Sequence, residues 1–458
     1  MSNQEMEYRI ESLNTLSFSK GDAPKCELTG FPATCKVVSP DIVLFYATRE
    51  HAEQAWHGIM HKIAPILGPL RSGAMVVGSQ EDRAKREYTV NMSKRALIDL
   101  CQQEASKMLI NGQYSLAMPG AIQALAFLKD IFGDGSVESV PPYLLLAEAN
   151  LGLEKFQQCE EFLSLANWSV LKNPSCSNAL KSQLHRNFGK LYTAQDKLEE
   201  ALKELAKDIY HSSLEVGPEH VDTSGGYFHM ANIFYIQNKV DNALAFYDKV
   251  VDIWYKFLGL VRNNAELAET FSESQLREGI EMLEKIMQTR VKLLGDAHIA
   301  TGEVKYTVGL LYLFLGDKDK ANEYVQTAAA IYKDKLGENH SSTQDVMSIA
   351  ETVKNEIATG RSGGGFGGSA GMATTGASAG GVTAARGSAG GTVPIGIHSG
   401  GVEGMKGFDQ LMNQFPEDMP RAATQSPIPL PPSSRQSGGG FDDSMRMTPS
   451  DSRGRVAG

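Results

Sequence analysis

The sequence predicts an all-α protein in which helical hairpins stack into a solenoid. Two observations support this prediction. Small residues at the crossing of paired helices recur every 42 residues, with one step of 36, and they are Ala117, Cys159, Ala201, Ala243, Gly279 and Ala321. No run between residues 87 and 358 alternates polar and apolar residues for long enough to indicate a strand. A fixed period of this size is typical of stacked repeats, because one hairpin cannot bury its apolar face alone.

Each repeat is expected to form one hairpin, with a large–small pair in its first helix and a small residue in its second. The middle repeat shows this best, with Phe188-Gly189 and Tyr192 before a short turn, then Ala201 and Leu205. Small residues at a helix crossing let the two helices pack closely. The pattern resembles the tetratricopeptide repeat, whose usual period is about 34 residues. The longer period here implies longer helices or loops.

Three Gly-x-x-His sequences each stand just before a predicted helix, at Gly217–His220, Gly295–His298 and Gly337–His340. They resemble the inter-repeat loops of kinesin-light-chain-type repeats. Three histidines are also a possible metal set. We expect instead that each histidine caps or braces its own loop through a hydrogen bond.

Changes in composition divide the chain into five segments. A polar leader covers residues 1–22, and a small module covers 23–70. A connector over 71–86 leads into the repeat solenoid of 87–360, whose last helix is expected to cap the array. Residues 361–458 then form a tail rich in Gly, Ala, Ser and Pro.

The tail is expected to be disordered, because its composition buries too little apolar surface to offset the entropy lost on ordering. Residues 407–419 carry apolar residues at helical spacing, so this stretch is a candidate for a short helix on a partner. Residues 426–432 are a candidate for polyproline II. The alternative for both is a spacer without a specific role.

Composition and charge exclude several functional classes. The 458 residues carry a formal net charge of −10, which argues against nucleic acid as a partner because phosphate binding needs a basic face. The five irregularly spaced cysteines indicate a reducing compartment rather than a disulfide framework. No apolar run reaches the 18 or so residues that a membrane span requires. Phosphate-binding loops and the common hydrolase and metalloprotease motifs are absent from the sequence, so we expect no enzyme activity.

The 23–70 module resembles the end of a MYND zinc finger, in which an aromatic-Cys-x3-Cys run precedes a helix with Trp, His and Cys. Trp56 is present, but the later ligand positions hold Ala47 and Ala64, and an earlier one holds Thr29. Two tetrahedral zinc sites need eight N or S ligands in all, which this segment does not supply. We therefore expect a degenerate, zinc-free module held together by packing. The alternative is a single zinc site with the candidate ligands Cys26, Cys35, His51 and His61.

Three further stretches carry a closer resemblance, and they are Val140–Leu153, Leu184–Tyr192 and Thr223–Tyr235. They are similar to the zinc finger MYND domain-containing protein 12 family of ciliated organisms. The match covers residues 23–300, weakens through 301–360 and ends at the tail. The order of a MYND-like module followed by repeats agrees with this family.

The resemblance implies a non-enzymatic scaffold of the motile-cilium axoneme, located in the cilium or flagellum and its cytoskeleton. Its implied partners are tetratricopeptide repeat protein 29, an axonemal inner-arm dynein heavy chain with its light chains, and the doublet microtubule. The scaffold would help tether a single-headed inner-arm dynein to the doublet. No cofactor, nucleic acid or membrane is implied.

The repeat register places Arg186 and Lys190 of one first helix, and Asn232 and Tyr235 of the next, on the inner face of the solenoid. They form a polar strip with one aromatic residue, which is our candidate protein-binding site. The alternative is that Arg186 pairs with a neighbouring acid such as Glu148.

Two other functional classes compete with the axonemal scaffold. A cytosolic co-chaperone or dynein-assembly adaptor would use a carboxylate clamp of Lys, Arg and Asn on first helices, which Arg186, Lys190 and Asn232 could provide. A lysine methyltransferase, which often accompanies a MYND finger, would need a β-rich catalytic domain. The predicted helical body excludes that fold.

Overall fold

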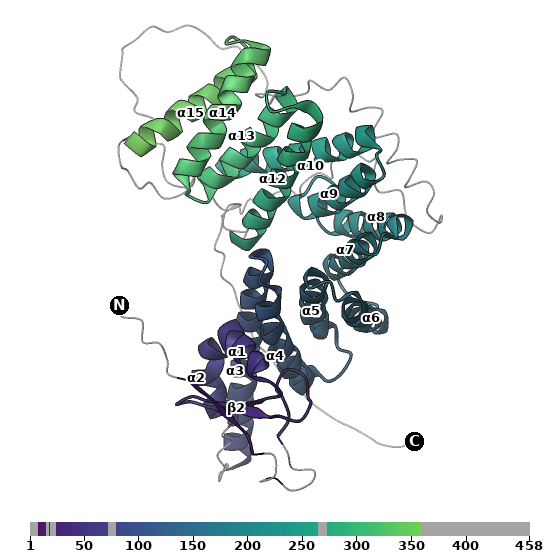
Figure 1. Ribbon diagram of the computed structural model, residues 1–458, viewed down its shortest axis with the longest axis vertical. Coiled ribbons are helices and arrows are strands. Elements are labelled where there is room, and N and C mark those ends of the chain that lie inside the picture. Colours follow the sequence, from purple (N-terminus) through teal and green to yellow (C-terminus); the bar gives the residue numbers. More distant parts are fainter. Residues whose placement is uncertain (1–7, 15–17, 19–23, 72–78, 264–272, 359–458) are drawn as a thin grey trace, which may run out of the picture. The chain divides into compact units, whose positions relative to one another are not determined.

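The structure is a computed structural model, and it describes residues 8–14, 18, 24–71, 79–263 and 273–358. The tail of 361–458, with its candidate helix at 407–419 and candidate polyproline II at 426–432, lies outside the described residues. The helices follow one another along the described repeat region as antiparallel neighbours (Figure 1).

The N-terminal module combines a small sheet with a bent helical segment. Three antiparallel strands in the order β1-β2-β3 are β1 (Arg9–Ser12), β2 (Cys35–Val38) and β3 (Val43–Tyr46). The helical segment comprises α1 (Arg49–Ala55), a π-helical turn η2 (Trp56–Met60) and α2 (His61–Arg71). The predicted leader of 1–22 therefore contributes a strand, which pairs with β2.

Packing in the module follows the pleat of β3. Leu44 and Tyr46 are fully buried, whereas Phe45, between them, is only half-buried, because successive side chains of a strand point to opposite faces. Trp56 is buried as expected, and its ring stacks on Tyr8 with the centroids 4.8 Å apart. The sheet is thus the part of the module that the sequence did not predict.

The module and the first hairpin share one hydrophobic core, in which Ile59 and Ile63 of the module pack with Leu97 and Phe127. The hairpin begins inside the predicted connector, because α3 starts at Gln80 rather than near residue 87. A reciprocal cap between Ser79 and Asp82 fixes that start. The connector therefore does not separate two independent cores.

Within the described residues, five pairs of consecutive helices form hairpins. They are α3 (Gln80–Ile110) with α4 (Tyr114–Phe132), α5 (Val140–Gly152) with α6 (Phe156–Lys172), α7 (Asn178–Ala194) with α8 (Leu198–Glu215), α9 (Val221–Ile236) with α10 (Val240–Asn263), and α13 (Ile299–Phe314) with α14 (Lys318–Leu336). A 3-10 turn, η3 (Val137–Ser139), precedes α5. Helix α12 (Glu273–Leu294) packs on α13, and α15 (Ser341–Ala358) packs on α14.

The small residues that set the predicted register are buried at helix crossings. Ala201 and Ala243 have no exposed surface, and a Cβ added at Gly189 would lie 2.7 Å from the Leu205 side chain. Gly279 differs from the prediction, because it faces the ring of Trp254 from α10 rather than a first helix of its own. The shortened step of 36 residues thus coincides with the long helix α10, which provides that contact.

The turn inside each hairpin repeats with the same period. Residues with positive φ stand at Glu154, Asp196 and Asn238, with φ of 57°, 59° and 59°. After each turn residue, the next backbone N–H bonds to a carbonyl five residues earlier, as in Lys197 to Tyr192 at 2.8 Å. This is the Schellman closure of a helix end, which favours glycine at the left-handed position.

The three loop histidines act as helix caps, as the sequence predicted. His220, His298 and His340 each accept a hydrogen bond at Nδ1 from the backbone N–H two residues later, at 3.2 Å in every case. A buried threonine recurs three residues after each histidine, and in two loops its hydroxyl donates to the loop glycine, as Thr223 does to Gly217.

No helix in the described ranges has both the length and the apolar character that crossing a bilayer requires.

Candidate protein-binding site

The candidate site lies on three consecutive first helices, α5, α7 and α9. Glu148, Lys190 and Asn232 stand 42 residues apart, so each occupies the same position in its repeat. Helix α7 contacts both α5 and α9. We call the surface formed by these three residues and Arg186 the first-helix face.

Lys190 is held by an acid of the preceding repeat. Its Nζ lies 2.9 Å from Oε1 of Glu148, and the two side chains are 20% and 38% exposed. The positive charge of Lys190 lowers the pKa of Glu148. Burial opposes the charged form of Lys190, but Glu148 and Glu278 outweigh it, so the pKa of Lys190 is raised. Both groups are therefore charged at neutral pH.

Arg186 pairs with an acid that the sequence analysis did not single out. Its Nε and Nη2 donate to the two carboxylate oxygens of Asp208 at 2.8 and 3.1 Å, and Nη2 also donates to the backbone carbonyl of Asp222 at 2.6 Å. Asp208 is fully buried and accepts a further bond from Ser182. Arg186 therefore forms an internal ion pair, which was the alternative to partner binding. Its partner is Asp208, whereas Glu148 pairs with Lys190.

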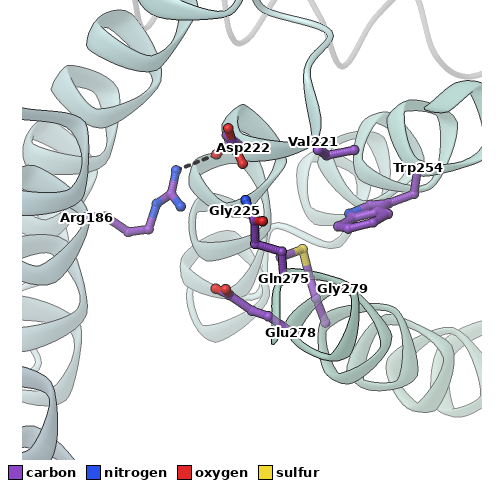
Figure 2. A pocket seen from close by; sticks show the side chains of 9 residues that line it. Arg186, Val221, Asp222, Gly225, Trp254, Gln275, Glu278 and Gly279 are labelled. Atoms are coloured by element: carbon purple, nitrogen blue, oxygen red, sulfur yellow. Dashed lines mark hydrogen bonds between the residues drawn. The ribbon is translucent and has the colours of Figure 1, made fainter. Parts of the chain in front are cut away.

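Arg186 borders a small pocket between α7, α9, α10 and α12. Figure 2 shows Glu278 of α12 extending toward the side on which Arg186 lies, with Trp254 and Gly225 also lining the pocket. The guanidinium packs over Gly225, where an added Cβ would lie 2.8 Å from Nη1. Burial opposes the charge of Arg186, yet Asp208 and Glu278 outweigh it, so its pKa is raised.

His229 of α9 joins this cluster of charges. Burial lowers the pKa of His229 well below its ordinary value, and the nearby cations Lys190 and Arg186 lower it further. The imidazole is therefore neutral at pH 7. A neutral ring beside two paired cations gives the first-helix face a donor and an acceptor without added charge.

Asn232 and Tyr235 occupy the C-terminal half of α9. The Asn232 Oδ1 accepts a hydrogen bond from the Tyr247 hydroxyl at 2.6 Å, so α10 fixes this amide. Tyr235 is 38% exposed and its neighbour Ile236 is 55% exposed. The structure therefore brings Arg186 and Lys190 into one charged cluster, and it leaves Tyr235 as the accessible aromatic residue at the end of the next helix.

Of the four candidate zinc ligands, Cys35 and His61 lie against different backbone carbonyls. Cys35 is buried, and its Sγ lies 3.4 and 3.2 Å from the carbonyls of Tyr46 and Thr48. His61 Nδ1, at the start of α2, lies 2.8 Å from the carbonyl of Trp56 at the start of the preceding turn η2. Among the described residues, no three His, Cys, Asp or Glu side chains are grouped as a metal site would require.

Comparison with known proteins agrees with the hairpin architecture. A tetratricopeptide repeat model matches residues 263–334. This chain contains tetratricopeptide repeats.

Two solved structures are similar to part of this chain. Both are crystal structures of a Podosopora anserina putative kinesin light chain with nearly identical TPR-like repeats, and one of the two carries a single substitution. Each is 17% identical and covers 52% of this chain, with a TM-score of 0.27. The comparison covers 96% of the substituted chain and 95% of the other.

Sequence analysis missed Asp208 and Glu278 as members of the charged cluster. A signal for Asp208 was available, because it is an acidic residue on the otherwise apolar face of α8 that contains Leu205 and Ile209. A carboxylate at such a position needs a partner, since an unpaired buried charge is costly. Glu278 gives no comparable signal, because its proximity depends on how α12 packs.

Proposed function

We propose that this chain is a non-enzymatic scaffold of the motile-cilium axoneme that helps tether a single-headed inner-arm dynein to the doublet microtubule. Tetratricopeptide repeats are a protein–protein interaction scaffold, and this is the general part of the function. The axonemal assignment rests on the resemblance of three stretches to the zinc finger MYND domain-containing protein 12 family.

The observation that supports the proposal most is the position of those stretches. They form α5, the middle of α7 and most of α9, which are the three first helices that build the first-helix face. The same helices carry the candidate contacts Lys190, Asn232 and Tyr235. The resemblance therefore falls on the surface that would hold a partner segment.

The proposed partners are tetratricopeptide repeat protein 29, the inner-arm dynein heavy chain with its light chains, and the doublet microtubule. The proposed location is the axoneme of the cilium or flagellum. In this assignment the protein uses no cofactor and binds neither nucleic acid nor membrane.

The test is co-sedimentation of the full chain with isolated axonemes, comparing the parent with a Lys190→Gln, Tyr235→Ala double variant. Arg186 is left unchanged, because charge reversal there would place a carboxylate against Asp208 and destabilise the fold. We expect the double variant to melt close to the parent and to sediment at least several-fold less. Lys203→Gln, at an exposed position of α8, is the matched control and should sediment like the parent.

Sedimentation of the double variant at the parent level would contradict a partner site on the first-helix face. Loss of all axoneme binding by the parent, together with tight binding of an acidic C-terminal peptide, would favour the co-chaperone alternative.

A further inference from the structure

Helix α3 extends beyond the helix with which it pairs. It has 31 residues, whereas α4 has 19. The C-terminal end of α4 reaches the level of Lys94, whose Nζ lies 3.1 Å from a carboxylate oxygen of Asp130. Residues 80–89 precede that level, and every one of them is exposed to solvent. We call residues 80–95 the α3 extension.

One face of the α3 extension carries a stripe that is apolar at its centre and charged at its ends. Ala84, Tyr88 and Met92 follow one another at intervals of four residues and are all exposed, Tyr88 by 68% and Met92 by 50%. Glu81 and Arg95 are also exposed, and they lie at the two ends of the same face. At 3.6 residues per turn, the five side chains fall within an arc of roughly 80° around the helix. We call these five residues the α3 stripe.

Packing within the chain does not explain the α3 stripe. Leu97 and Cys101, through which α3 joins the shared core, are buried and lie on the opposite side of the helix. Within the described ranges, neither Glu81 nor Arg95 forms an ion pair, and the Arg95 guanidinium lies 5.3 Å from the centre of the Phe132 ring. Helices in proteins gain most of their stability by packing one face, so the exposed stripe favours a partner.

We propose that the α3 stripe pairs antiparallel with the α3 stripe of a second copy of this chain. Tyr88 lies midway along the stripe, seven residues after Glu81 and seven before Arg95. A twofold axis at Tyr88 therefore places Glu81 of each copy opposite Arg95 of the other, and Ala84 opposite Met92. Both copies contribute the same surface, as in most homodimers. This pairing is independent of the proposed axonemal function.

The charges of the stripe select the second copy and its direction. In the antiparallel arrangement, a glutamate meets an arginine at each end of the contact. A parallel arrangement would set glutamate against glutamate and arginine against arginine, which is repulsive. Because exposed ion pairs contribute little to affinity, these pairs fix direction and register. Contact of Tyr88 and Met92 with the other copy supplies the attraction.

The dimensions of the stripe suit a short pair of helices. From Glu81 to Arg95 the helix rises about 21 Å at 1.5 Å per residue. The small side chain of Ala84 leaves room for the long side chain of Met92 from the other copy, so the two helices can approach closely. Each copy contributes one helix, which places the contact at the small end of protein interfaces. The dimer should therefore dissociate on dilution.

The first experiment measures self-association of the full-length chain by analytical ultracentrifugation over a range of protein concentrations. We expect a reversible equilibrium between monomer and dimer. Tyr88→Glu places two carboxylates against each other at the twofold axis, so it should raise the dissociation constant at least about tenfold. Thr89→Glu adds the same charge at an exposed position beside the stripe. This matched control should dimerise like the parent.

A charge exchange tests the antiparallel register. Glu81→Arg and Arg95→Glu should each weaken self-association several-fold, and the double variant should recover most of it, because opposite charges again face each other. A mixture of the two single variants should form heterodimers more readily than either variant forms homodimers. Circular dichroism of each variant checks that the helix content is unchanged.

A cysteine at the axis tests which residue lies there. Tyr88→Cys should give a disulfide-linked dimer under mild oxidation with oxidised glutathione, because the two thiols face each other across the axis. The five native cysteines are buried, so they should contribute little to this reaction. Thr89→Cys is the matched control, and we expect it to form the linked dimer several-fold more slowly.

Three results would overturn the proposal. The first is a chain that stays monomeric at every concentration, which would leave the stripe open for a different protein. The second is a dimer that neither Tyr88→Glu nor the charge exchange alters, because the copies would then meet through another surface. The third is equal rates of disulfide formation for Tyr88→Cys and Thr89→Cys, which would indicate random collision.

Discussion

Side chains have opposite surroundings on the first-helix face and on the outer face of α6, which carries Leu165, Trp168 and Leu171. On the first-helix face, Arg186 and Lys190 are held by carboxylates and are less than a quarter exposed. On the outer face of α6, Trp168 and Leu171 have more than half of their surface exposed. The first arrangement follows from contact between neighbouring helices, whereas the Trp168 ring packs against a loop residue, Gly135, where an added Cβ would lie 2.2 Å from it.

This difference predicts which substitutions should lower the stability of the repeats. Substitution should be costly where it leaves a buried charge without its partner, or a volume that the fold cannot accommodate. Lys190 is an exception, because its partner Glu148 is 38% exposed and can be solvated when Lys190 is replaced. Residues on the outer face of α6 should change the free energy of unfolding little when they are replaced, because more than two-fifths of each side chain (Leu165, Trp168 and Leu171) is already exposed to solvent. The predictions below test this contrast in order of expected effect.

The largest expected effect is that of Asp208→Ala on the first-helix face. It would leave the Arg186 guanidinium, only 17% exposed, without its carboxylate. Breaking one side of a buried ion pair typically costs about 3–5 kcal/mol, and we expect a loss in this range from urea unfolding. Asp208→Asn should lose less, because the amide oxygen still accepts a bond. An alanine variant as stable as the parent would mean that the pair is not structural.

Ala201→Trp tests the helix crossing directly. Ala201 has no exposed surface, so a large ring at this position must displace its neighbours. Overpacking of this kind costs about 1–3 kcal/mol or more. We expect a clear fall in melting temperature by differential scanning calorimetry. Lys203→Trp introduces the same ring at an exposed position of the same helix, so this control should melt close to the parent.

Acid should weaken the contact between α7 and α8 through His211. Burial lowers the pKa of His211 to about 4, with added repulsion from His185 and Lys181. The unfolded chain takes up a proton near pH 6.5, so the stability present above pH 6.5 is lost as the pH falls toward 4. Because the ring is only half-buried, solvent screening reduces the effect, and the expected loss for this group is about 1–2 kcal/mol.

The measurement for His211 is the free energy of unfolding at several pH values between 7 and 4. His211→Gln should flatten part of the slope, whereas His398→Gln, outside the described residues, should leave it unchanged. His229 contributes in the same direction, because its pKa is also lowered. If the unfolding free energy of the parent and of His211→Gln changed equally with pH, His211 would not be the group responsible.

A gain in stability is expected at the turn of the α9/α10 hairpin. Asn238 has a φ of 59°, a left-handed conformation that glycine adopts without a Cβ penalty. We expect Asn238→Gly to stabilise the chain by a few tenths to about 1 kcal/mol. The measurement is thermal unfolding of both Asn238→Gly and a control, Asn322→Gly. Asn322 lies inside α14, so glycine there should destabilise the helix and lower the melting temperature.

The smallest expected effect is that of Trp168→Lys on the outer face of α6. Lysine and tyrosine already occupy this outer face in α8, so the hairpin should tolerate a charge there. We expect a change in unfolding free energy within about 0.5 kcal/mol, the usual range for a surface substitution. A loss above about 2 kcal/mol would show that Trp168 stabilises the hairpin, and the contrast with Asp208 would fail.

Much of the repeat region could be predicted from the sequence, because it repeats. The small residues at 117, 159, 201 and 243 predicted the crossings, and the Gly-x-x-His sequences predicted the caps. The sheet of the N-terminal module could not be predicted in the same way. Its strands are four residues long, and β1 precedes its partner β2 by more than twenty residues.

By itself, the sequence determined the hairpin period, the cap residues and the cluster of polar residues on the first helices, because these depend on local spacing. Only the tertiary structure decided which acid holds which cation. Lys190 reaches back 42 residues to Glu148, whereas Arg186 reaches forward to Asp208 and to the Asp222 carbonyl. Glu278 approaches both cations only because α12 packs beside the hairpins. Such pairings join residues that are far apart in the sequence, so they depend on how the helices pack and cannot be read from residue spacing.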